Sequence, residues 1–207
     1  GGFNTIKVSG SAGTILGNYS PGSSCCVLFD GATIWVASGG TLSNLRVSDG
    51  AALQSISVGG SISGLAFDGT HIWLSDMLSP GLVKKITLGG AGVGSFTVGS
   101  TPRGLVFDGS HMWVANASGD KLTKLATDGT IVGAYAVGDE PMDVVFDGEY
   151  IWVANFSGTV NKLLASTGEL LGTYGAVPGL TDILFDGTNI WVVGAGGKVV
   201  KIMPVRL

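Results

Sequence analysis

One short motif recurs five times along the 207-residue chain: Phe-Asp-Gly, two variable residues, Ile or Met, and then Trp. Successive copies lie 38, 40, 39 and 39 residues apart, and the motif accounts for all five Trp residues. A period near ~40 that holds its register over five copies indicates a repeat architecture, in which each unit packs against the next. The motifs run from Phe29, Phe67, Phe107, Phe146 and Phe185 to Trp35, Trp73, Trp113, Trp152 and Trp191.

Each period has the content of four short strands. In the period from Arg103 to Met142, apolar or alternating runs occupy residues 104–107, 112–116, 122–126 and 131–137, with Asp-Gly or other turn residues between them. Four strands per ~40 residues, repeated, are typical of a propeller of four-stranded blades. A β-solenoid would need much shorter repeats. The sequence therefore predicts an all-β, five-bladed β-propeller of four-stranded antiparallel blades.

The composition agrees with this fold and excludes several classes of protein. Charged residues make up 13% of the chain and hydrophobic residues 45%, and 36 residues are Gly. Blades that pack face to face cover both faces of their strands, so charge becomes scarce, and Gly serves the many turns. The net charge of −4, with no basic cluster, argues against a nucleic-acid partner. No uncharged stretch is free enough of Gly, Ser and Thr to be a transmembrane segment.

The two ends of the chain do not begin and end with whole repeats. Residues 6–19 match the third and fourth strands of residues 122–135, whereas residues 198–203 match a third strand with no fourth. We therefore expect the outer strand at 14–19 to complete the last blade, which removes two exposed sheet edges. Both ends carry a candidate third strand, at 4–8 and 198–203, and only one can occupy the position; the spare segment could fray, or it could pair with a second chain and give a homo-oligomer. The expected single domain has repeats at approximately 24–62, 63–102, 103–141, 142–180 and 181–207, the last completed by 1–23.

The only cysteines, Cys25 and Cys26, are adjacent. Neighbouring residues of a regular strand point to opposite faces, so the sequence predicts two separate, partly buried thiols. By this argument they neither bridge to each other nor share a metal, and the redox compartment stays open.

The repeat Pro102-Arg-Gly-Leu-Val-Phe-Asp-Gly-Ser-His-Met-Trp-Val-Ala-Asn116, continued to Pro141, resembles the YVTN/NHL-type propeller repeats of bacteria. This superfamily includes streptogramin (virginiamycin B) lyase-like proteins and is similar to the gluconolactonase-like propellers. The resemblance covers nearly the whole chain and implies a propeller fold, a binding or scaffold role, and an extracellular or cell-envelope location. Related enzymes have more blades and use His and Glu, or a carboxylate-bound divalent cation, at the channel mouth. This chain departs from them in blade number and in its two histidines.

Most chemistry-bearing residues of the motif have a structural explanation. The Asp of each Asp-Gly pair is expected to form the turn between the first and second strands, rather than a repeating metal site. His71 and His111, the only histidines, fall in the same turns, at the end opposite to the usual ligand face of a propeller. No nucleophile triad, zinc-ligand spacing or phosphate loop is present.

One constellation faces the predicted channel. The second positions of the five innermost strands are expected at one height, and adjacent blades place Asp143 and Asp182 there. Carboxylate oxygens are ligands for calcium or magnesium, so this pair is the candidate cation site. The alternative is that each Asp caps backbone amides of its own connection. The five positions are Cys26, Gly64, Gly104, Asp143 and Asp182.

Three functions follow from these features. The first is a non-enzymatic binding or scaffold module that meets a protein or glycan at the channel-entry face. The second is a divergent lyase or lactonase-like enzyme that uses a cation at Asp143 and Asp182. The third is a module that self-assembles through its terminal strands. The candidate partner contacts are Arg103, Asp139, Glu140, Met142 and the loop from Leu78 to Gly81.

Overall fold

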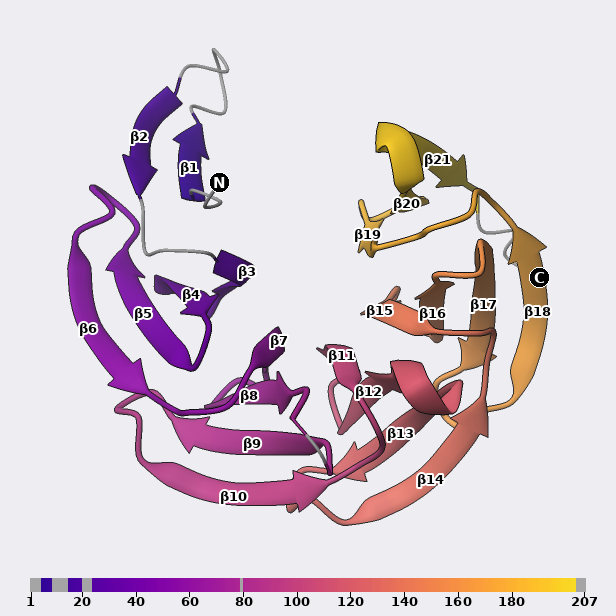
Figure 1. The fold of residues 1–207 in the computed structure, drawn as a ribbon, viewed down its shortest axis with the longest axis horizontal. Helices are drawn as coiled ribbons and strands as arrows, with labels where there is room; N and C mark the ends of the chain where they lie inside the picture. The colour runs from indigo at the N-terminus through magenta and orange to yellow at the C-terminus, as the bar shows by residue number, and fades with distance from the viewer. Residues whose placement is uncertain (1–4, 9–14, 20–23, 79, 204–207) are drawn as a thin grey trace.

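The protein is an all-β, five-bladed β-propeller (Figure 1). The computed structural model describes residues 5–8, 15–19, 24–78 and 80–203. Four blades have four antiparallel strands, and the blade that follows them in sequence has three. The blades are β3 (Ser24–Phe29), β4 (Thr33–Ser38), β5 (Thr41–Arg46), β6 (Ala52–Ser57); β7 (Ile62–Phe67), β8 (His71–Asp76), β9 (Leu82–Thr87), β10 (Gly92–Thr97); β11 (Pro102–Phe107), β12 (His111–Asn116), β13 (Lys121–Ala126), β14 (Ile131–Ala136); β15 (Pro141–Phe146), β16 (Tyr150–Asn155), β17 (Thr159–Leu164), β18 (Leu170–Gly175); and β19 (Asp182–Phe185), β20 (Ile190–Gly194), β21 (Lys198–Ile202).

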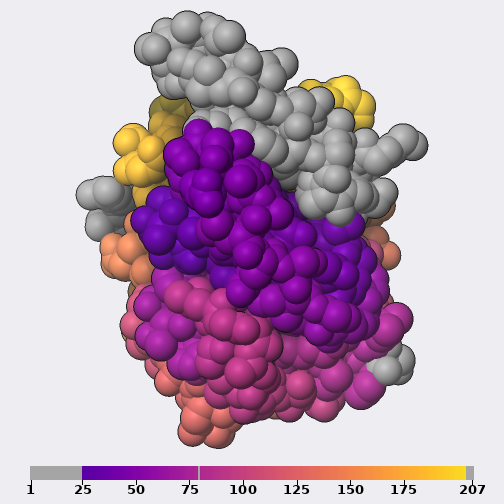
Figure 2. All heavy atoms as spheres, turned by 90° about the vertical axis from the view of Figure 1, so that its left-hand side faces the viewer, coloured from indigo at the N-terminus to yellow at the C-terminus, as the bar shows by residue number. Residues whose placement is uncertain are grey.

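Each blade runs from the propeller axis outwards. The first strand lies innermost and the fourth forms the outer wall, which Figure 2 shows as a continuous surface over the first two blades. Two 3-10 turns, η1 (Ala117–Gly119) and η2 (Ala195–Gly197), are the only helical elements among the described residues. No helix in the described ranges is long and apolar enough to cross a membrane.

The ring does not close in the predicted way. Strand β2 (Ile15–Tyr19) pairs with β1 (Thr5–Val8) in a sheet of its own, and β21 is the last strand of its sheet in the described part of the chain. The β1–β2 register shifts at Lys7/Val8 and the β13–β14 register shifts at Lys124/Leu125, so both hairpins contain an irregularity, and the assignment of β1 and β2 to third and fourth strands stays a prediction. Each third-strand segment keeps its local hairpin partner, and within the described ranges no strand pairing joins β1–β2 to β19–β21, which lie apart at the top of Figure 1.

The repeated Asp builds the turn between the first two strands of every blade, as predicted. One carboxylate oxygen accepts hydrogen bonds from the backbone amides two and three residues on, and the other accepts from the repeat Trp indole. The indole-to-carboxylate distances are 2.6–2.8 Å in all five blades. The Gly that follows has φ between +91° and +103°, a conformation that glycine adopts without steric cost.

The core consists of apolar layers between neighbouring blades. Trp35, Trp73, Trp113 and Trp152 are buried, whereas Trp191 of the last blade is half-buried. In the four later blades a third-strand Lys lies over the Trp of its own blade, with its Nζ 4.8–5.3 Å from the ring centroid. Lys124 also donates to the Ala165 carbonyl at 2.7 Å, which ties the third blade to the fourth. Trp packing between blades, the predicted role, is therefore confirmed for four of the five.

Candidate functional site

A cavity of about 780 Å³ lies at the propeller axis. The innermost strands of all five blades line it, and each contributes the residue that the sequence places at its second position. The prediction that these five residues meet at one height of a central channel agrees with this lining. They are Cys26, Gly64, Gly104, Asp143 and Asp182.

Backbone bulges near the start of the innermost strands shape this lining. The pairing of first and second strands shifts register between Ser24 and Cys26, Ile62 and Gly64, Pro102 and Leu105, and Pro141 and Asp143. A bulge places two residues opposite one and re-aims their side chains. The simple in–out alternation of a strand therefore does not hold at these positions.

The Asp143 carboxyl sits between two neighbouring strands of the channel. It fits there because Gly104 on β11 has no side chain: a Cβ at residue 104 would collide with Asp143 Oδ1. On the other side, the Ile183 amide donates to Asp182 Oδ1 at 2.8 Å and to Asp143 Oδ2 at 3.4 Å. Backbone capping, the alternative to cation binding, thus contributes to the placement of both carboxyls.

Asp143 and Asp182 interact as a carboxyl pair. Burial raises the pKa of Asp143 well above its usual value, and a hydrogen bond and charge repulsion from Asp182 raise it further. Asp143 therefore keeps its proton to a higher pH than an isolated carboxyl does. It can both donate and accept hydrogen bonds, or exchange its proton for a cation. Among the described residues, no group of three or more His, Cys, Asp or Glu is arranged to hold a metal ion.

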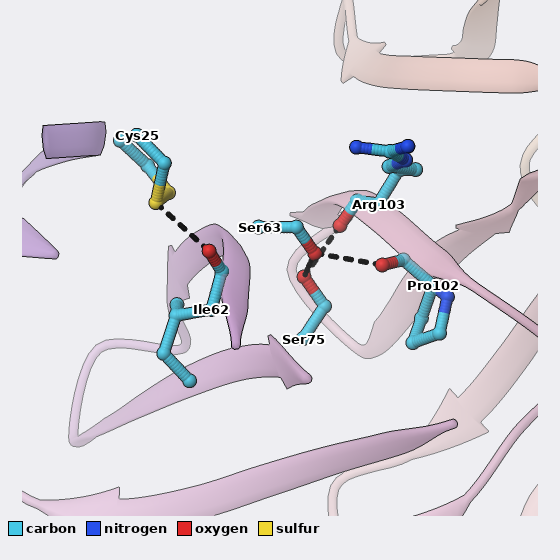
Figure 3. Close-up of a disulfide and its surroundings, with 7 residues drawn as sticks. Cys25, Ile62, Ser63, Ser75, Pro102 and Arg103 are labelled. Carbon is cyan, nitrogen blue, oxygen red and sulfur yellow. Dashed lines mark hydrogen bonds between the residues drawn. A yellow bond between two sulfur atoms is a disulfide. The ribbon is translucent and has the colours of Figure 1, made fainter. Parts of the chain in front are cut away.

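Cys25 and Cys26 form a disulfide, which contradicts the prediction of separate thiols (Figure 3). The prediction assumed a regular strand, but the bulge at Ser24/Cys26 interrupts β3 at this point. Both residues line the central cavity. The disulfide was not found from the sequence, although the adjacency of the cysteines was the available signal.

Two serines link the second blade to the third beside the cavity (Figure 3). Ser63 Oγ donates to the Pro102 carbonyl at 2.7 Å, and Ser75 Oγ donates to the Arg103 carbonyl at 2.6 Å. Both carbonyls lie at the β11 bulge. The serines thereby satisfy backbone acceptors near the register shift and fix the position of Arg103.

Of the predicted contact residues, the structure places Met142, but not Arg103, in the lining of the channel. Met142 lines the cavity, and the Arg103 side chain extends from β11 away from the serine pair (Figure 3). Arg103 Nε is buried and has no hydrogen-bond partner in the described structure.

The other predicted contacts lie in loops and do not line the cavity. Asp139 and Glu140 are exposed in the connection from β14 to β15, where Glu140 N donates to Asp120 Oδ1 at 2.9 Å. Leu78 is exposed in the β8–β9 loop. Gly81 is buried in a turn against the Gly99 carbonyl, so its role is to shape this loop.

A second, smaller cavity of about 420 Å³ lies between the third and fourth blades. His111 and Glu149 line it, together with the buried Lys124. It sits at the Asp-Gly turns, the end of the inner strands opposite to the channel residues. His71 and His111 thus lie at the Asp-Gly turns, as predicted. Asp143 and Asp182 lie at the opposite end of the inner strands.

Comparison with known proteins supports the fold alone. No protein-family profile and no curated protein sequence matches the chain. Hydrazine synthase of Kuenenia stuttgartiensis is similar in structure, with a TM-score of 0.66 and 16% identity over 84% of this chain, which spans 63% of that one. A functionally unknown protein from Desulfotomaculum acetoxidans has a TM-score of 0.78 and 14% identity over 96% of this chain and 75% of its own. At these identities the likeness shows the propeller architecture.

Proposed function

We propose that the protein is a non-enzymatic binding module that takes a glycan, or a segment of a partner protein, at the mouth of its central channel. The observation that carries this proposal is the convergence of five different residues from five blades on one cavity. Its volume of about 780 Å³ lies within the range of ligand pockets.

The polar groups of the cavity favour a neutral ligand that carries hydroxyl groups. A carboxyl pair with a shared proton donates and accepts hydrogen bonds, as sugar hydroxyls require. These groups give orientation and specificity, while Met142 supplies apolar contact.

The test is ligand-observed NMR with a panel of neutral mono- and oligosaccharides and short peptides. Thr181 is exposed and lines the cavity, so Thr181→Trp is expected to fill the mouth and abolish binding. The matched control is Thr188→Trp, an exposed position in the turn between β19 and β20. Equal binding by both variants would place the ligand elsewhere, and binding of peptides alone would favour a protein partner.

The carboxyl pair supports a second candidate, a cation-dependent lyase or lactonase-like enzyme. Calcium or magnesium would take the place of the shared proton between Asp143 and Asp182, so cation binding should strengthen as pH rises. Calorimetric titration at pH 5 and pH 8, with the Asp143→Asn/Asp182→Asn variant as control, tests the site. Lactone and ester turnover tests the activity.

Self-association is a third candidate, and the open ring supports it. Val27 and Val199 are 55% and 58% exposed, although their equivalents in the third blade, Leu105 and Leu122, are buried. Such faces pack against each other at every internal blade boundary, so the two ends could join two copies head to tail. Light scattering on the purified chain would show this, and a monomer at high concentration would refute it.

We also place the module outside the cytoplasm. The Cys25–Cys26 disulfide supports this location because disulfides persist mainly in oxidising compartments.

A further inference from the structure

We propose that Cys25 and Cys26 form a reversible thiol–disulfide exchange site at the channel mouth, which is reduced by a dithiol and reoxidised by a disulfide. The two cysteines are the only ones in the chain, and both line the central cavity. The proposal is independent of which ligand the channel binds.

A bond between adjacent residues is a poor structural staple. Disulfides stabilise proteins mainly by closing long loops in the unfolded chain, and the effect grows with loop length. The Cys25–Cys26 bond encloses no intervening residue. Opening this bond should therefore lower the stability of the fold only slightly. We therefore assign the bond a chemical role at the channel rather than a structural one.

The surroundings of the two sulfur atoms set the order of attack. The Cys25 side chain is exposed, whereas Cys26 packs against the apolar layer between the first and second blades, which includes Trp35 and Ile62. A thiolate of the reductant therefore attacks Cys25 Sγ, the disulfide breaks, and Cys26 leaves as a thiolate that takes up a proton. The second thiol of the reductant then attacks the mixed disulfide, forms the reductant's own disulfide and releases Cys25 as a thiol. Two electrons and two protons pass to the protein.

The structure already holds a partner for the reduced state. Cys25 Sγ lies 3.0 Å from the Ile62 carbonyl oxygen on β7 (Figure 3). A disulfide sulfur carries no hydrogen, so this is a close contact in the oxidised form. After reduction the thiol has a hydrogen to donate to that oxygen, which links β3 to the neighbouring blade. Both redox states thus fit the same backbone.

Thiol counting on the folded protein tests the proposal. Without reductant, a thiol reagent should find no free thiol. After treatment with dithiothreitol and desalting, it should find two per chain, with the circular dichroism spectrum unchanged and the mass greater by two hydrogens. Oxidised glutathione should restore the starting state. Thiols that appear only in guanidinium, or two free thiols before reduction, would overturn the proposal.

Single variants test the order of attack. Cys26→Ser leaves Cys25 to form a mixed disulfide with oxidised glutathione, and this should be ~10-fold faster than the same reaction in Cys25→Ser. Equal rates would contradict the greater accessibility of Cys25, on which the assignment of the attacked sulfur rests. Reduced wild type should bind phenylarsine oxide, which needs paired thiols, and neither single variant should do so.

The double variant Cys25→Ser/Cys26→Ser tests the assumption about stability. Its melting temperature should stay within a few degrees of that of the oxidised protein, because no loop is opened. A loss much larger than that would show a structural bond and contradict the exchange site. Glycan binding by the channel can succeed or fail in either case, so the two proposals are separable.

Discussion

The aspartates of the Asp-Gly turns and the aspartates of the central channel are the same residue type in opposite electrostatic settings. At Asp108 burial raises the pKa, but hydrogen bonds from Trp113, His111 and Ser110 outweigh it and the pKa is lowered. At Asp143 burial raises the pKa, and its neighbour Asp182 adds to the increase. The turn carboxylates are surrounded by donors, whereas the channel carboxyl faces another acid. Hydrogen bonds from these donors stabilise the turns. The carboxyl pair in the channel has no such set of donors, so its oxygens are available to a ligand.

The two settings have opposite effects on stability as pH changes. A carboxyl whose folded pKa is lowered contributes stability above its unfolded pKa, and this is lost as pH falls. Asp30, Asp68 and Asp108 belong to this class. A carboxyl whose folded pKa is raised contributes stability below its unfolded pKa, and this is lost as pH rises through the folded value. Asp143 belongs to this second class.

The largest expected effect is at a turn. Asp108→Ala removes the acceptor of the buried Trp113 indole and of the Ser110 and His111 amides. Unpartnered buried donors cost ~1–3 kcal/mol each, so we expect a loss of about 3 kcal/mol in the free energy of unfolding. Urea denaturation measures it. Asp128→Ala is the matched control, because this Asp-Gly turn is exposed and its side chain contacts no indole. Similar losses in both variants would mean that the indole bond is unimportant.

A smaller effect is expected where the channel is tightest. Gly104→Ala would place a Cβ 2.7 Å from the Asp143 Cα, which is backbone and cannot turn aside. Overpacking of this kind costs ~1–3 kcal/mol, and thermal unfolding should show a lower melting temperature. Gly119→Ala is the control, because nothing lies within 4 Å of a Cβ there. An unchanged melting temperature for Gly104→Ala would refute the placement of the Asp143 carboxyl.

The next prediction is a substitution that should raise the melting temperature instead of lowering it. Asp143→Asn keeps the shape of the side chain and mimics its protonated form, so it removes the unfavourable charge of the pair. We expect the melting temperature to rise by roughly 2–4 °C at pH 8 and to change little at pH 4. Differential scanning fluorimetry across this range measures it. A gain that is the same at both pH values would show that Asp143 is not protonated in the folded protein.

The smallest effect is expected in the last blade. Asp186 makes the same bond to Trp191 that Asp108 makes to Trp113, but here the bond is exposed. Asp186→Ala should therefore lower the melting temperature less than Asp108→Ala does, because water can replace the lost partner. Equal losses would indicate that the face of the last blade is covered in solution.

Much of the fold could be predicted because it repeats. A motif that returns every ~40 residues defines the length of one blade. The Asp-Gly turns, the Trp layers and the convergence at the channel all follow from this repeat. The ring closure could not be predicted in the same way. Two third-strand segments compete for one position. The repeat pattern does not show which of them pairs with the lower free energy. The disulfide was missed because the bulge at Ser24/Cys26 breaks the alternation on which the prediction relied.

The sequence by itself determined the blades, because local turn chemistry and alternation act within ~40 residues and are stated five times. Only the tertiary structure decided what happens at the axis. There, strands from different repeats approach closely, so a missing Cβ at Gly104 makes room for Asp143, and burial together with Asp182 in the next blade raises the pKa of Asp143. Such effects depend on distances between residues ~40 positions apart, which no local pattern encodes.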